Sequence, residues 1–202
     1  MRAPAKIALV TVIVVLLAGL LGAGAFLRRG ISARDDPTAL EAFVARRMRH
    51  YAVPRTARQA GNPVPLTDAV LAEGRAHFAD HCASCHGNDG RGDTAIGRNL
   101  YPKAPDMASS MTQSLSDGEI FYIIHNGVRL TGMPAWGDGT PEDDLESWKL
   151  VHFIRHLPAI TPEEITEMES LNPKSPAELE EEEQIRRFLE GGDTAPPHEH
   201  HP

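Results

Sequence analysis

The sequence has few of the residues that stabilise a small protein core. It contains 2 cysteines in 202 residues, and both lie in one five-residue motif, so no disulfide can join distant segments. Aromatic residues make up 5% of the chain, against 17 glycines and 16 prolines. A domain of about 90 residues buries a smaller fraction of its surface than a large one and is marginally stable unaided. A buried apolar group would supply the area that such a domain lacks here.

Basic residues are scarce beyond the first third of the chain. Residues 1–66 carry 10 Lys/Arg and 3 Asp/Glu, residues 67–158 carry 7 and 13, and residues 159–202 carry 3 and 12. Such asymmetry indicates distinct environments for the segments. The acidic two thirds of the chain argue against a nucleic-acid partner, and their charge would steer basic protein partners instead.

Charge is absent from one long stretch, Ile7 to Leu27, which is 21 residues long and follows a short basic start. A membrane-spanning helix needs about 20 predominantly apolar residues. A cleavable signal peptide is the alternative, with an A-x-A-like site at Ala23-Gly24-Ala25. The apolar run continues past that site, which favours an uncleaved anchor. Residues 1–30 are therefore predicted to form a transmembrane anchor, with a signal peptide as the alternative.

The motif that organises the chain is Cys82-Ala83-Ser84-Cys85-His86, the C-x-x-C-H signature of c-type haem attachment. Two cysteines on one helical turn can each form a thioether to a haem vinyl group, and the histidine can offer a neutral nitrogen to the iron. A thioredoxin-like redox pair would need a βαβ setting, and no strand pattern is found. A zinc finger would need a second ligand pair nearby, but 66 residues lie between Cys85 and the H-x3-H of His152 and His156.

A glycine-rich loop, Gly87–Gly92, follows the motif, and Gly132-Met133-Pro134-Ala135-Trp136 comes downstream. With these motifs the sequence resembles the class I c-type cytochromes over roughly Leu66 to Pro158. The resemblance implies a small helical fold around one covalent haem c. It also implies electron transfer without transformation of a substrate.

The resemblance assigns four site residues. Cys82 and Cys85 would hold the haem covalently, His86 would be the proximal iron ligand, and Met133 would be the distal ligand. Met107 and Met111 are the alternatives to Met133. A thioether ligand would occupy the sixth iron position, which argues against oxygen or peroxide chemistry.

One residue of the family pattern is missing. Many relatives carry a G-P-N-L turn whose proline carbonyl orients the proximal histidine. This chain has Gly97-Arg98-Asn99-Leu100 instead. Either Pro102 or Pro105 could take that role, which matters because a second hydrogen bond fixes the tautomer and basicity of a ligating imidazole.

The expected fold is all-α: a small cytochrome c-like helical domain preceded by a transmembrane helix and followed by an acidic helical or disordered tail. The expected parts are residues 1–30 (anchor), 31–65 (amphipathic helix and linker), 66–158 (cytochrome c domain) and 159–202 (tail). Helical spacing and caps predict the following helices: Thr38–Tyr51, Thr67–His81, Ser116–Asn126, Pro141–Leu157, Thr161–Leu171 and Pro176–Leu189. The first of these either packs on the domain or lies on anionic lipid.

Ala52–Pro65 is rich in Pro, Gly and Ala and is interpreted as a linker. The resemblance implies that the first helix of the domain crosses the last at close range, and Gly74 and Phe78 are placed at that crossing because a glycine permits close backbone approach. His152 and His156 share one face of the last helix and are interpreted as a solvated face rather than a metal site.

The orientation in the membrane rests on the resemblance. Arg2 and Lys6 precede the apolar stretch and Arg28, Arg29 and Arg34 follow it, so a positive-inside count does not favour a cytoplasmic N-terminus. Family knowledge points the other way, because haem attachment to C-x-x-C-H takes place outside the bacterial cytoplasmic membrane. The predicted location is therefore the bacterial cytoplasmic membrane, single-pass, with the haem domain on the periplasmic, outer face.

The predicted function is that of a membrane-tethered monohaem cytochrome c, an electron carrier rather than an enzyme. Its partners would be redox proteins or a membrane oxidoreductase complex, together with membrane lipid around the N-terminal helix. One alternative is a haem enzyme or a gas or redox sensor with a displaceable sixth ligand. Another is a metal-binding protein that uses the histidines of His198-Glu199-His200-His201.

Overall fold

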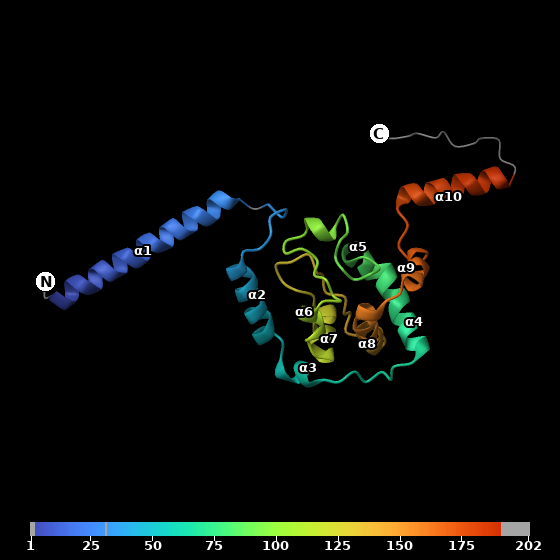
Figure 1. The fold of residues 1–202 in the computed structure, drawn as a ribbon, viewed down its shortest axis with the longest axis horizontal. Helices are drawn as coiled ribbons and strands as arrows, with labels where there is room; N and C mark the ends of the chain where they lie inside the picture. The colour runs from blue at the N-terminus through green and yellow to red at the C-terminus, as the bar shows by residue number, and fades with distance from the viewer. Residues whose placement is uncertain (1–2, 31, 191–202) are drawn as a thin grey trace.

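The computed structural model describes residues 3–30 and 32–190, and every regular element within them is a helix (Figure 1), which confirms the all-α prediction. The terminal histidines lie outside the described residues. The helices are α1 (Ala3–Arg29), α2 (Ala39–Ala52), α3 (Arg55–Gln59), α4 (Asp68–His77), the π-helix η1 (Phe78–Cys82), α5 (Ala83–His86), the 3₁₀-helix η2 (Gly97–Asn99), α6 (Ser110–Gln113), α7 (Asp117–Asn126), α8 (Pro141–His156), the 3₁₀-helix η3 (Leu157–Ala159), α9 (Pro162–Glu169) and α10 (Pro176–Leu189).

Helix α1 projects away from the helices that carry the core (Figure 1). Its segment Pro4–Arg28 is long and apolar enough to cross a membrane, and none of its strongly apolar window is buried against the rest of the protein. In water such a helix would expose a large apolar surface, whereas in a bilayer that surface meets lipid. Its length and composition are those of a single membrane span.

The core is organised by the crossing of α4 and α8. Thr67 caps the start of α4, because its side chain accepts a hydrogen bond from the N–H of Val70. The aromatic rings of Phe78 and Phe153, both fully buried, lie 5.0 Å apart across the crossing. Gly74 lies at the same crossing and is buried, as the sequence predicts. This contact holds the start of the C-x-x-C-H segment against the last helix of the domain.

Helix α7 forms the second wall of the core. Ser116 and Glu119 form a reciprocal capping box at its start, and Ile120 and Ile124 face inward with 4% and 5% of their surface exposed. Gly118 lies against α3, where a Cβ would come 1.8 Å from the carbonyl oxygen of Ala57. Only a glycine permits that approach.

The stretch interpreted as a linker is therefore packed on the domain. Val53 is 3% exposed, and the side-chain amide of Asn62 donates to the carbonyl of Trp148 at 2.9 Å. His152 Nε2 lies 2.7 Å from the carbonyl oxygen of Val64. The segment 53–64 closes the domain on the side of α7 and α8, although its composition is that of a connector.

The segment after Pro158 also contributes to the core. Met168 of α9 is fully buried. Glu164 lies 2.9 Å from His156 and 3.3 Å from Arg75, so His156 is hydrogen-bonded to a carboxylate rather than left solvated. No residue of α10 is buried. The division of the chain at residues 30, 65 and 158 stays a prediction, and helices on both sides of the central part pack onto it.

Candidate haem site

The C-x-x-C-H motif lies at a change of helical geometry. The end of α4 passes into the single π turn η1, in which the N–H of Ala83 bonds to the carbonyl of Phe78. Cys82 ends this turn, and α5 carries the motif on to His86. Gly87 then stops the helix with φ +73°, a value that glycine adopts without steric cost. Single π turns inside helices are frequent at functional sites, because the wider turn redirects the side chains that follow.

The two cysteines of the motif are both partly buried and form no disulfide. Burial, with a smaller contribution from Cys85, raises the pKa of Cys82 to about 12. The pKa of a thiol that attacks disulfides or binds metal as a thiolate is instead lowered by its surroundings. The environment of Cys82 therefore does not suit a thioredoxin-like redox pair.

The imidazole of His86 is the buried nitrogen donor of the site, with 7% of the residue exposed. Burial lowers its pKa below the usual 6.5, and the backbone of Pro105 partly opposes this effect. A proline backbone can only accept, so the Pro105 carbonyl is the group that faces the ring, without completing a hydrogen bond. Nδ1 of His86 is buried and has no hydrogen-bond partner among the described residues. Of the two prolines left open by the sequence, Pro105 is thus the one beside the imidazole.

The loop after the motif folds back over His86. The N–H of Gly92 donates to the carbonyl of His86 at 2.7 Å, and the N–H of Met107 donates to Gly90 at 2.8 Å. A Cβ on Gly92 would stand 2.3 Å from the carbonyl oxygen of Ala104, the residue before Pro105. These contacts hold the Pro105 segment against the histidine.

Thr94 fastens the same loop to the motif helix, a role that the sequence pattern does not reveal. Its hydroxyl lies 3.0 Å from the carbonyl oxygen of Ser84 and 3.1 Å from that of Cys85, and it accepts from the N–H of Gly97 at 2.8 Å. A threonine in a glycine-rich loop carries no periodicity, so only the folded contacts identify it.

Met133 is half-buried, and hydrogen bonds of its backbone close the loop in which it lies. Its carbonyl accepts from the N–H of Val128 at 3.1 Å, and its N–H donates to the hydroxyl of Thr131 at 3.1 Å. Leu130, at the tip of this loop, has φ +63° and is 92% exposed. Gly132 lies against Leu100, which follows η2, and a Cβ there would meet that side chain at 2.6 Å. Through Leu100 and η2 the Met133 loop is joined to the loop that covers the motif.

The loop beyond Met133 is tied to the end of α7. The N–H groups of Trp136 and Gly137 donate to the carbonyls of Ile124 and His125 at 3.1 and 3.0 Å. The indole of Trp136 meets the ring of His81 edge-on, with centroids 5.3 Å apart. His81 directly precedes Cys82, so this ring contact connects the methionine loop to the motif from the other side.

The alternative methionines occupy different places. Met107 is 9% exposed and belongs to the hydrophobic core. Met111 is 53% exposed and lines a pocket beneath α2, together with Leu115 and Ile123. Met133 is the partly buried methionine of the three, and its role as distal ligand stays a prediction.

The geometry fits a covalently held haem. Cys82 and Cys85 lie in consecutive helical segments, and burial favours the neutral form of the His86 imidazole. Neutral imidazole is the form that binds haem iron. Two thiols and one imidazole are residue types that could hold haem c, and Met133 stays the predicted distal ligand.

Comparison with known proteins places the chain in a family. The family model described as cytochrome c oxidase, cbb3-type, subunit III matches residues 69–154. Cytochrome c6 of Cladophora glomerata is 32% identical over 78 residues, which are 39% of this chain and 80% of that protein. The chain belongs to the c-type cytochromes. Membership implies haem c, and helix α1 makes it a membrane-anchored cytochrome.

Two longer relatives are subunits of oxidases. The cbb3-type cytochrome c oxidase subunit CcoP of Cereibacter sphaeroides is 33% identical over 79 residues, 39% of this cytochrome and 25% of the subunit. Subunit FixP of Rhizobium meliloti is 31% identical over 94 residues, 46% of this cytochrome and 29% of the subunit. The cytochrome thus spans about a quarter of the length of these subunits.

Proposed function

We propose that this cytochrome is a membrane-tethered monohaem electron carrier that passes single electrons to or within a membrane oxidoreductase complex. The observation that carries the proposal is the buried imidazole of His86, enclosed by the 87–107 loop and adjacent to two cysteines at haem-attachment spacing. A haem c supplies one-electron exchange at its iron when it is bound. The protein has to hold the group in one position and keep its ligands in place.

The chain divides these tasks among a few residues. Cys82 and Cys85 hold the ring by thioether bonds, and His86 supplies the proximal nitrogen. Pro105, held by the contact of Gly92 with Ala104, faces the imidazole and favours one orientation of it. Met133 supplies the distal thioether from a loop whose backbone hydrogen bonds limit its movement. With Met133 as a ligand, a bound haem iron would have no open coordination position, which suits a carrier rather than an oxygen-activating enzyme.

The proposed partner is a complex of the cbb3 oxidase kind. Two relatives are subunits of such oxidases, and the matched family model describes a subunit of the same kind. In this proposal the haem domain lies on the periplasmic face, where covalent haem attachment takes place, and α1 crosses the cytoplasmic membrane. The cytochrome then acts as a subunit or a tethered carrier and transforms no substrate itself.

The test is the absorption spectrum of the mature full-length protein in its oxidised, reduced and carbon-monoxide-treated reduced forms. A low-spin spectrum that carbon monoxide does not change, with a methionine–iron charge-transfer band, is the expected result. A high-spin or carbon-monoxide-reactive spectrum would overturn the carrier and favour a haem enzyme or a sensor. Absence of a covalent haem, together with metal binding lost on removal of His198–His201, would favour the metal-binding alternative.

A further inference from the structure

Helix α2 turns its apolar side away from the protein. Its apolar side chains at helical spacing form one stripe, here called the α2 stripe, and are between 43% and 75% exposed: Leu40, Phe43, Val44, Met48 and Tyr51. None of the residues of α2 is buried. An amphipathic helix on a soluble domain normally buries this face, so the orientation of α2 is reversed.

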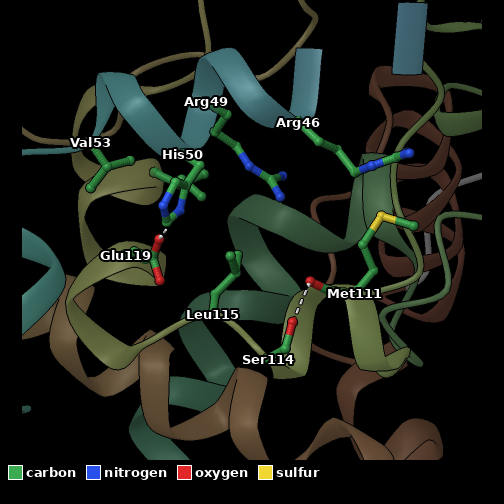
Figure 2. Close-up of a pocket in the computed structure, with 9 residues that line it drawn as sticks. Arg46, Arg49, His50, Val53, Met111, Ser114, Leu115 and Glu119 are labelled. Carbon is green, nitrogen blue, oxygen red and sulfur yellow. Dashed lines mark hydrogen bonds and ion pairs between the residues drawn. The ribbon is translucent and has the colours of Figure 1, made fainter. Parts of the chain in front are cut away.

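The polar side of α2 makes the contact with the domain. Figure 2 shows Arg46, Arg49 and His50 on the side of the helix that faces α6 and α7, around a pocket of about 200 Å³. His50 Nδ1 lies 3.8 Å from a carboxylate oxygen of Glu119, and Val53 at the end of the helix is 3% exposed. These contacts fix the rotation of α2 about its axis, with the α2 stripe pointing outward.

The position of α2 in the chain shows that the α2 stripe can reach the membrane that α1 crosses. Nine residues separate the end of α1 at Arg29 from the start of α2 at Ala39. Nine residues span at most about 30 Å when fully extended, so a membrane that holds α1 is always within reach. In Figure 1, α2 lies on the side of the domain from which α1 departs and runs across the direction of α1.

The charge around α2 suits an anionic surface. Arg46 and Arg49 face the domain, whereas Arg47 lies beside the α2 stripe and forms no ion pair with any residue in the described parts of the chain. The guanidinium carbon of Arg47 lies 5.3 Å from the ring centroid of Phe43, on the edge of the α2 stripe. An arginine in that place can lay its stem along lipid and keep its charge at the headgroups. Positive charge beside an apolar face is the pattern of helices that bind anionic membranes.

We propose that α2 is an interfacial helix, with the α2 stripe inserted in the headgroup region of the anionic bilayer that α1 crosses. The cytochrome domain, held to the opposite side of α2, is thereby fixed in one orientation above the membrane instead of moving freely on its tether. This proposal goes beyond electron transfer and is independent of which residues bind the haem.

The test uses the mature full-length protein with one introduced cysteine, in bilayer discs of phosphatidylcholine and phosphatidylglycerol. An environment-sensitive fluorophore is attached at Val44→Cys in the α2 stripe. The matched control carries it at Ser170→Cys, at the exposed end of α9 on the far side of the domain (Figure 1). Quenching is measured with iodide from the water and with spin-labelled lipid from the bilayer. Neither position is buried, so neither change should affect folding.

We expect iodide to quench the fluorophore at position 44 several-fold less than at position 170, and the spin-labelled lipid to quench it several-fold more. Equal quenching at both positions would overturn the proposal, because the α2 stripe would then face water. Protection of position 44 from both quenchers would also overturn it, since a protein surface would then cover the stripe. In discs of phosphatidylcholine alone, lipid quenching should fall, and unchanged quenching would overturn the role of Arg47.

Discussion

Gly74 of α4 lies directly against the backbone of Lys149 in α8. A Cβ at position 74 would stand 2.4 Å from the carbonyl oxygen of Lys149 and 3.3 Å from Cβ of Phe153. The neighbour at 2.4 Å is helix backbone, which cannot rotate aside as the end of a flexible side chain can. This glycine therefore sets the separation of α4 and α8. It also fixes the position of η1, which follows α4 and leads into the C-x-x-C-H motif.

Gly74→Ala should lower the free energy of unfolding by about 1–3 kcal/mol, because the added methyl group forces the two helices apart. This loss is expected although alanine favours an isolated helix over glycine by about 1 kcal/mol. Chemical denaturation of the two proteins in the same detergent measures the difference. Gly61→Ala is the control, since no atom lies within 4 Å of its added Cβ. Equal stability of the Gly74 variant and the native protein would mean that the crossing can relax.

The crossing is also where the sequence was most informative. A stripe of apolar residues at helical spacing predicts the helix, because helix faces are local properties of the residues. The crossing itself is implied by the family resemblance, and the one glycine in the stripe indicates where along the helix it lies. The start of α7 is predictable for the same reason, since Ser116 is a cap residue in the sequence and caps the helix in the structure, where Glu119 completes a capping box.

Contacts between distant segments were not predictable in this way. The stretch 53–64 has the composition of a linker, and only the folded chain shows Ala57 against Gly118 and Asn62 on Trp148. Composition does not reveal the π turn before Cys82 either, because the turn differs from an α-helix only in a backbone hydrogen bond that spans one residue more. The sequence leaves the orientation of α2 open for a related reason. An amphipathic pattern shows that a helix has an apolar and a polar face, but it does not show which of them contacts the domain.

Met133→Ala should remove the methionine–iron band, lower the reduction potential and allow carbon monoxide to bind the reduced protein. The reason is that Met133 is the proposed thioether ligand and no other methionine lies in its loop. The backbone hydrogen bonds of Met133 with Val128 and Thr131 restrain that loop. The spectrum and a potentiometric titration measure these changes.

Two further methionines serve as controls for that variant. Met107→Ala should leave the band intact but cost about 2–5 kcal/mol of stability, because it creates a cavity in the core. Met111→Ala should change neither property, since its side chain is half exposed beneath α2. Loss of the band in either control, with the band kept in Met133→Ala, would reassign the distal ligand.

Stability should fall at acid pH in a way that depends on Glu164. Partial burial opposes ionisation of this carboxyl, but hydrogen bonds from His156 and the N–H of Thr161 and the charge of Arg75 outweigh it, so its pKa lies below the usual 4.5. The unfolded chain therefore takes up the proton first as pH falls. The stabilisation is complete above about pH 5 and is lost as pH falls from 4.5 through the lowered value.

Glu164→Gln isolates this contribution, because glutamine keeps the size of the side chain and removes its charge. Denaturation midpoints between pH 6 and pH 4 should fall less steeply in the variant than in the native protein. Glu178→Gln is the matched control, since Glu178 also has a lowered pKa but lies on α10, away from the core, with hydrogen bonds to Ser175 alone as the main cause. A Glu164 variant with the pH dependence of the native protein would show that α9 is held by Met168 rather than by the charge cluster.

The chemistry of Cys82 provides a test of haem attachment that does not depend on the iron ligands. Only a thiolate reacts with iodoacetamide, and a thiol whose pKa is about 12 is ionised in roughly one molecule in ten thousand at pH 8. In protein made without haem maturation, Cys82 should therefore be alkylated slowly while the chain is folded, and much faster in denaturant. In the mature protein both thiols should resist alkylation even in denaturant, because thioether bonds do not reverse on unfolding. Mass spectrometry of tryptic peptides distinguishes the two cases, and a mature protein that gains two carboxamidomethyl groups in denaturant would exclude covalent attachment at this motif.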